Sequence, residues 1–126
     1  MVGIGYKFDT ERLIMKSSLM PLLPVADVRK AQEYYRDVLG CTIDWNWEDK
    51  YGAVSREGVT ILFSKESKPR KGICCCIVVP EVDELCKKLR TAGADVVAHP
   101  ETKPWGAREF TIQDNNGHLF RIFRAA

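Results

Sequence analysis

The chain repeats its own pattern once, and this repeat restricts the possible folds more than any other feature of the sequence. At an offset of 54 residues, the matched pairs are Val25 with Val79, Asp27 with Glu81, Val28 with Val82, Tyr35 with Leu89 and Arg36 with Arg90. After a slip of one residue, the pairs are Gly40 with Gly93 and Ile43 with Val96. Stacked repeat proteins need about three units for stability. Two copies in 126 residues therefore predict one domain with pseudo-twofold symmetry.

The first copy begins with a strand and a helix. An apolar run covers residues 19–25, and Asp27 follows as a good N-cap residue. Apolar positions then recur at helical spacing, at Val28, Ala31, Tyr35, Val38 and Leu39. Gly40 is suited to the left-handed position that ends a helix. The pattern predicts an amphipathic helix from about residue 28 to residue 39.

Three strands are predicted to complete the first copy. Residues 41–47 alternate, with Ile43, Trp45 and Trp47 expected on one face. Two further strands cover residues 52–56 and 59–64, and residues 65–71 form a charged loop.

The same order returns in the second copy. Residues 73–79 are a continuous strand-like run, and an apolar stripe precedes Gly93, at Val82, Leu85, Cys86 and Leu89. Residues 108–113 and 118–124 alternate on either side of an Asn-Gly pair, which supplies the positive φ angles of a type I′ turn. The chain therefore ends in a predicted β-hairpin.

Together these patterns predict an α+β fold of two tandem βαβββ modules, at about residues 19–66 and 72–125. Residues 1–18 are predicted to be an N-terminal arm outside the single domain of residues 19–125. Each helix is expected to cover one face of a curved mixed sheet. The uncovered faces then form a cup, which is a common setting for a small-molecule site.

Composition limits the kinds of partner that the chain can bind and the cellular compartment in which we expect it. Nineteen basic and seventeen acidic residues leave a net charge of +2, too little for a nucleic-acid-binding domain. The five cysteines are an odd number without CxxC spacing, so they predict neither a disulfide framework nor a zinc ribbon. The longest apolar stretch, residues 73–80, is too short to span a bilayer. We expect a cytoplasmic protein with reduced thiols and no membrane partner.

Three segments resemble the vicinal oxygen chelate superfamily, also called glyoxalase/bleomycin resistance/dioxygenase proteins. They are PVADV (24–28) with YYRDVLG (34–40), PWGAREF (104–110), and DNNGH (114–118). The second segment is especially similar to the bleomycin-resistance branch. The resemblance covers about residues 19–125 and implies the cup-shaped fold already expected from the repeat.

Enzymes of this superfamily typically hold a divalent metal with His and Glu side chains in the cup. The resemblance places Met20, Leu62, Cys74 and Arg121 at the ligand positions. This set does not suit a hard cation or zinc, because only the cysteine is a strong ligand. We therefore expect neither the usual metal site nor another cofactor.

Several side chains are candidate ligand contacts, and each also has a plain structural explanation. Aromatic side chains that can stack on a planar molecule are Trp45, Trp47, Phe63 and Trp105; the strand aromatics can equally pack within the sheet or at an interface. Polar candidates are Cys74, Arg108, Glu109 and Arg121. Arg121 either recognises an anion or, as we prefer, pairs with Glu109 across the hairpin. The cysteine run is expected to pack in the core, although Cys74 can be a reactive thiol if it faces the cup.

The two histidines, His99 and His118, are expected to be a loop residue and an exposed hairpin residue, respectively. The leading functional hypothesis is a metal-free, bleomycin-resistance-like homodimer that sequesters a planar or aromatic small molecule in a crevice between subunits. Its positive charge argues against cationic bleomycin as the ligand. The alternatives are a superfamily enzyme, of lyase or dioxygenase type, with an unconventional or absent metal site, and a small dimeric partner or regulatory domain with a filled cup.

Overall fold

The computed structural model describes residues 18–125, so the predicted N-terminal arm lies almost entirely outside the described residues. The first half contains β1 (Leu22–Val25), α2 (Val28–Asp37), β2 (Thr42–Trp47), β3 (Tyr51–Arg56) and β4 (Val59–Lys65). The second half contains β5 (Cys74–Val78), α3 (Val82–Thr91), β6 (Asp95–Thr102), β7 (Arg108–Gln113) and β8 (Leu119–Arg124). The order confirms the predicted α+β fold with two βαβββ units.

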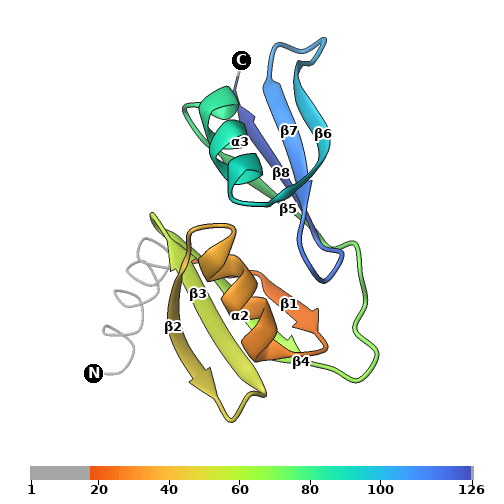
Figure 1. The fold of residues 1–126 in the computed structure, drawn as a ribbon. Helices are drawn as coiled ribbons and strands as arrows, with labels where there is room; N and C mark the ends of the chain where they lie inside the picture. Colours follow the sequence, from red (N-terminus) through yellow and green to blue (C-terminus); the bar gives the residue numbers. More distant parts are fainter. Residues whose placement is uncertain (1–17, 126) are drawn as a thin grey trace, which may run out of the picture.

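Each half forms its own four-stranded sheet, with the orders β1-β4-β3-β2 and β5-β8-β7-β6. The first strand of each half pairs in parallel with the last, and the other pairs are antiparallel. Figure 1 shows the two halves one above the other, with α2 and α3 on the same side. We call the sheet faces turned away from these helices the open faces.

Helix α2 begins after Asp27, as the sequence predicts, whereas α3 begins at Val82, so that Pro80 lies before the helix and not in its first turn. Asp27 accepts a hydrogen bond from the Lys30 amide at 3.0 Å, whereas Glu81, the equivalent residue, makes no side-chain capping bond. Gly40 has a φ of 73°, the left-handed conformation that follows a helix end. Within residues 18–125, neither helix is long and apolar enough to cross a bilayer.

The hydrophobic core is shared by both halves. Tyr35 is fully buried, and its ring centroid lies 4.9 Å from that of Phe63 and 6.1 Å from that of Phe120. The Tyr35 hydroxyl donates a hydrogen bond to Asp114 Oδ2 at 2.5 Å. This bond connects α2 of the first half to the β7–β8 turn of the second.

His118 also connects the halves, and its expected exposure on the hairpin was wrong. The side chain is fully buried; Nε2 lies 2.8 Å from the Pro24 carbonyl oxygen, and the Ile73 amide donates to Nδ1 at 3.3 Å. His118 directly precedes β8, and alternation places it on the same inward side as Phe120 and Ile122, which explains its burial. The other histidine, His99, is exposed but belongs to β6, not to a loop.

Two local expectations need correction. The terminal hairpin exists, but only Gly117 has a positive φ in its turn. The Asp114 carboxylate accepts hydrogen bonds from the amides of Asn116 and His118. The turn is therefore not type I′. In β2, the pairing register shifts between Ile43 and Trp45, so these residues do not share a face.

Candidate functional site

The candidate site lies on the open face of the second sheet. The inward residues of β7 and β8, including Phe110 and Ile122, are buried in the core against α3. Because successive side chains of a strand alternate between faces, Glu109 and Arg121 project from the opposite face. Cys76 is the register partner of Arg121 on the neighbouring strand, so it shares this face.

Arg121 and Glu109 form an ion pair across the β7–β8 hairpin, as the sequence predicted. Arg121 Nε donates to Glu109 Oε2 at 2.8 Å. The Glu109 side chain is only 10% exposed, compared with 47% for Arg121. The pKa of Arg121 is raised, first by this hydrogen bond and next by the charge of Glu109. The pair is thus neutral as a whole, and its carboxylate already has a partner.

A hollow of about 410 Å³ lies over this ion pair. Its lining residues are Cys76, Trp105, Ala107, Glu109, Arg121, Phe123 and Ala125. Trp105 is 65% exposed and belongs to a turn in which the Gly106 amide donates to the Lys103 carbonyl at 2.9 Å. The turn thereby holds a large flat side chain beside a polar floor. Three predicted site residues, Trp105, Glu109 and Arg121, come together here.

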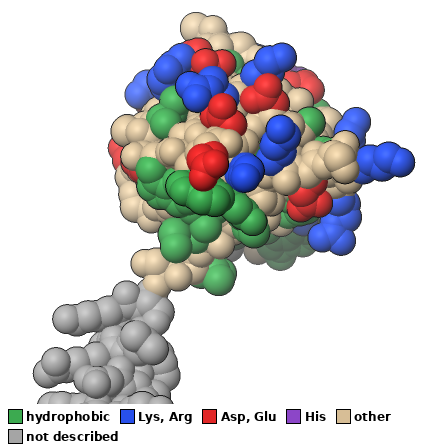
Figure 2. Space-filling model, turned by 90° about the horizontal axis from the view of Figure 1, so that it is seen from below, with side chains coloured by type: hydrophobic (Ala, Val, Ile, Leu, Met, Phe, Trp, Pro, Cys, Tyr) green, Lys and Arg blue, Asp and Glu red, His purple; other side chains and the backbone are tan. Residues whose placement is uncertain are grey.

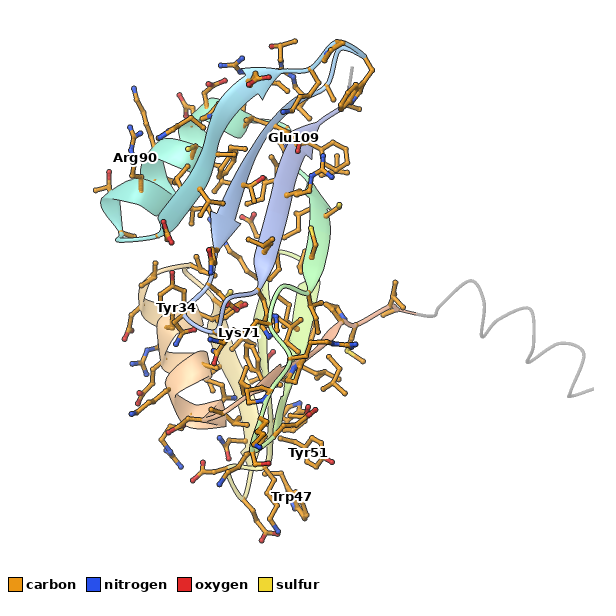
Figure 3. All side chains as sticks on the ribbon, turned by 90° about the vertical axis from the view of Figure 1, so that its right-hand side faces the viewer. Tyr34, Trp47, Tyr51, Lys71, Arg90 and Glu109 are labelled. Atoms are coloured by element: carbon orange, nitrogen blue, oxygen red, sulfur yellow. The ribbon has the colours of Figure 1, made fainter. Side chains whose placement is uncertain are left out.

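Trp45 and Trp47 occupy a different surface, the open face of the first sheet. Both are about half exposed, and the Trp47 ring centroid lies 6.2 Å from that of Tyr51. Lys50 Nζ lies 5.5 Å from the Trp47 centroid, within cation–π range. Figure 3 shows Trp47 and Tyr51 at the far end of the molecule from Glu109. One chain therefore does not bring these tryptophans to the hollow.

Figure 2 shows the end of the molecule that carries the first sheet, with hydrophobic side chains gathered in a patch bordered by charged ones. The large exposed hydrophobic residues of β1, β2 and β3 are Leu22, Trp45, Trp47 and Tyr51. An apolar surface of this kind is typical of an interaction site.

Two predicted contacts lie away from the open faces. Phe63 is fully buried against Tyr35, so its expected place among the ligand contacts was wrong. Arg108 points to the helix side, where its Nε and Nη2 donate to the two carboxylate oxygens of Asp83 at 2.8 and 2.9 Å. The pKa of Asp83 is lowered, first by this hydrogen bond. Neither residue lines the hollow.

The cysteine run is divided between the two faces of β5. Cys74 and Cys76 are exposed, whereas Cys75 packs against the core and burial raises the pKa of its thiol. Core packing, the expected state, therefore holds only for Cys75. Cys76 and Phe123 were missed as lining residues, although alternation from Cys74 and Arg121 identifies both.

A second cavity, of about 400 Å³, was not expected from the sequence. It lies between the halves on the helix side and is lined mainly by aliphatic side chains, including those of Leu39, Ile77 and Leu85. Strand and helix periodicity show which faces are apolar but not how tightly two apolar faces meet.

The metal site implied by the superfamily does not fit this chain. Leu62 follows Ile61 on β4 and has no donor atom, and Arg121 is a cation already bound to Glu109. Among residues 18–125, no group of three or more His, Cys, Asp or Glu side chains is placed to hold a metal ion. The described donor set therefore offers no conventional three- or four-ligand centre.

Sequence comparison with known proteins identifies a family model and a relative that each match most of the chain. The model of the Glyoxalase/Bleomycin resistance protein/Dioxygenase superfamily matches residues 18–122. An uncharacterized protein, YraH of Bacillus subtilis strain 168, is 28% identical, and the alignment covers 81% of this chain and 93% of that protein.

Solved structures share the fold. TioX from Micromonospora sp. ML1 has a TM-score of 0.75 and 23% identity, over 87% of this chain and all of that one. A bleomycin resistance determinant encoded on the transposon Tn5 has a TM-score of 0.77 and 18% identity, over 87% of this chain and 98% of that one. Likenesses at this identity establish the fold alone. Because the family model spans most of the sequence, this chain belongs to the Glyoxalase/Bleomycin resistance protein/Dioxygenase superfamily.

Proposed function

We propose that this protein binds and sequesters a planar or aromatic small molecule without a metal ion, in a crevice completed by a second copy of the chain. The observation that carries the proposal is the hollow on the second sheet, where the exposed Trp105 stands beside the Arg121–Glu109 pair. A large aromatic side chain held at the edge of a concave surface suits the stacking of a flat ligand.

The polar groups of the hollow favour binding over acid–base catalysis. Glu109 is nearly buried and accepts a hydrogen bond from Arg121, so it is not a free general base. The pair presents no net charge to the ligand, and the chain carries a charge of only +2. These features support a neutral or weakly polar ligand rather than the strongly cationic bleomycin.

The aromatic face of the first sheet supports the homodimer. Trp45, Trp47 and Tyr51 each expose about half of their surface, which is unusual for large side chains in an isolated soluble domain. A second copy that covers this face with its own second sheet buries these side chains and closes the hollow on the ligand. The described cysteines are all free thiols, which supports a location in the reducing cytoplasm.

An enzyme of the same superfamily is the second candidate. The family description includes glyoxalases and dioxygenases, and the hollow contains a thiol, Cys76, beside Glu109 and Arg121. Metal analysis of protein purified without chelators separates the two functions. We expect less than a stoichiometric amount of divalent metal; one ion per chain, with turnover lost on its removal, favours the enzyme.

Tryptophan fluorescence tests the binding proposal directly. We expect planar aromatic compounds to quench part of the emission of the full-length protein, and Trp105→Phe to abolish the Trp105 contribution and weaken binding by about tenfold, the effect of losing part of one stacking contact. Tyr34→Phe on α2, away from both open faces, is the control and should leave the quenching and the affinity unchanged. Two results contradict the proposal. One is that no member of a broad panel of aromatic compounds quenches the emission; the other is that Trp105→Phe leaves the quenching unchanged.

A further inference from the structure

Strand β5 carries two exposed cysteines, of which the proposed function uses only Cys76, as part of the wall of the hollow. Cys74 and Cys76 lie two residues apart on the same open face, and both are exposed. Cys75, between them, faces the core. Two thiols on one face of a strand can act on a single ligand, whereas Cys75 is directed away from it.

Strand geometry decides which product the pair can form. A rise of about 3.3 Å per residue places the two Cα atoms about 6.6 Å apart. Disulfides usually join Cα atoms about 5.5 to 6 Å apart and rarely exceed about 6.8 Å. A metal ion with two bonds of about 2.3 Å needs sulfur atoms only about 4.6 Å apart, which rotation of the two side chains can provide. The spacing therefore favours a bridging ion over an intrachain disulfide.

The neighbouring groups limit the number of ligands. Glu109, the nearest carboxylate named in the hollow, is held by Arg121 at 2.8 Å. In the part of the chain that the structure describes, no third His, Cys, Asp or Glu joins the pair in a metal-holding group. Two thiolates without a third ligand suit a soft ion that accepts two-coordinate geometry, rather than zinc, which requires four ligands.

The site also has a fixed neighbour on its own face. Arg121 is the register partner of Cys76, and its Nε donates to Glu109 Oε2 at 2.8 Å. A soft ion held by the two thiols therefore lies beside the Arg121–Glu109 pair.

We propose that Cys74 and Cys76 together form a two-coordinate thiolate site for a soft monovalent metal ion of the Cu(I) class. Each thiol loses its proton to solvent, two sulfur–copper bonds form, and copper and sulfur keep their oxidation states. The site lies at the edge of the hollow, which Cys76 lines, but it does not depend on the binding of a planar molecule there.

Anaerobic titration of the full-length protein with Cu(I), buffered by a colorimetric Cu(I) chelator in the presence of ascorbate, tests the site. We expect one tightly bound ion per chain. Cys74→Ser and Cys76→Ser should each weaken binding by about 100-fold or more, because each removes one of two ligands. Cys75→Ser is the matched control on the same strand and should retain the affinity. Ag(I) should compete for the same site.

Three results overturn the proposal. The first is half an ion per chain, which indicates that the ion bridges two copies. The second is a loss of Cu(I) affinity in Cys75→Ser equal to that in Cys74→Ser or Cys76→Ser, and the third is rapid closure of a Cys74–Cys76 disulfide in air, detected by mass spectrometry. Urea unfolding of each variant shows whether lost affinity reflects lost folding. Because Trp105→Phe keeps both thiols, its Cu(I) titration separates failure of the metal site from failure of small-molecule binding: this variant should lose affinity for the planar molecule and keep its affinity for Cu(I).

Discussion

At the scale of single residues, His118 shows how one side chain can join the two halves. The Ile73 amide donates to Nδ1, so Nδ1 carries no proton and Nε2 is assigned as the donor to the Pro24 carbonyl. These two hydrogen bonds tie β1 of the first half to the residue just before β5 in the second, so His118 acts as a structural connector.

Replacement of His118 by leucine should destabilise the protein by about 2 to 4 kcal/mol, because it leaves the buried Pro24 carbonyl and Ile73 amide without partners. Urea unfolding followed by circular dichroism measures the change. The exposed His99 provides the control, and His99→Leu should change the free energy of unfolding by less than about 0.5 kcal/mol. Equal effects at the two positions would refute the assigned role of His118.

The burial of His118 was available from the sequence, but its partners were not. Period-two alternation along β8 places His118 on the same side as Phe120 and Ile122. The Asn-Gly turn signal beside it outweighed that pattern in the prediction. The bond to Pro24 depends on contact between the halves, which no local pattern specifies.

At the scale of elements, the repeat offers a natural comparison between two helices at equivalent positions. Asp27 caps α2 through a hydrogen bond to the Lys30 amide, whereas Glu81 precedes α3 without one. Glutamate is one methylene longer than aspartate and is a poorer N-cap residue. The two halves thus share an architecture without sharing the interactions that begin their helices.

Asp27→Ala should lower the free energy of unfolding by about 1 kcal/mol, the usual cost of losing an N-cap bond. Glu81→Ala at the equivalent position should lower it by less than about 0.5 kcal/mol, since no capping bond is removed. Thermal and urea unfolding of both variants measure the difference. A loss at Glu81 as large as that at Asp27 would show that the cap is not the cause.

The order and type of the helices and strands were predictable from periodicity, because each element buries one apolar face. The register shift in β2 was not predictable, because a side chain distant in the sequence stabilises it. Gln32 of α2 donates to the Trp45 carbonyl at 2.7 Å and to the Ala53 carbonyl at 3.2 Å. Gly52 leaves the room for this amide, since a Cβ there would lie 2.6 Å from Gln32 Nε2. The turn after β7 also differed, since the Asp114 side chain shapes it.

At the scale of the whole molecule, the candidate site was predicted in part. Trp105, Glu109 and Arg121 meet because β7, β8 and the turn before β7 are neighbours in one half. Trp45 and Trp47 were expected at the same site, but they lie on the other sheet. Their distance from the hollow depends on how the two halves are placed, which alternation within a strand does not reveal.

The bond between Tyr35 and Asp114 predicts how stability depends on alkaline pH. Burial, and next the Asp114 charge, raise the pKa of Tyr35 well above its ordinary value of 10.0. The folded protein therefore keeps a proton that the unfolded chain loses above about pH 10. Below that pH, Tyr35 should cause no change in the free energy of unfolding. Above it, the free energy of unfolding should fall by about 1.4 kcal/mol per pH unit.

Urea unfolding between pH 8 and pH 11 measures this dependence. Burial also raises the pKa of the Cys41 thiol from its ordinary value of 9.0, so the decline should begin near pH 9 and steepen above pH 10. Tyr35→Phe should be less stable at pH 8, because Asp114 loses a buried donor, and should show a shallower decline above pH 10. An unchanged slope in this variant would contradict the assignment.

The sheet topology also affects how the chain folds while it is being synthesised. Both parallel pairs close within one half: Leu22 pairs with Leu62, and Cys74 pairs with Leu119. All strand pairing of the first half is therefore possible once Lys65 has left the ribosome, before the second half has emerged. The shared core and the contacts of Tyr35 and His118 can form only after the last strand emerges. A nascent chain thus carries a hydrogen-bonded but incompletely covered first half, the stage at which chaperones have the most exposed apolar surface to bind.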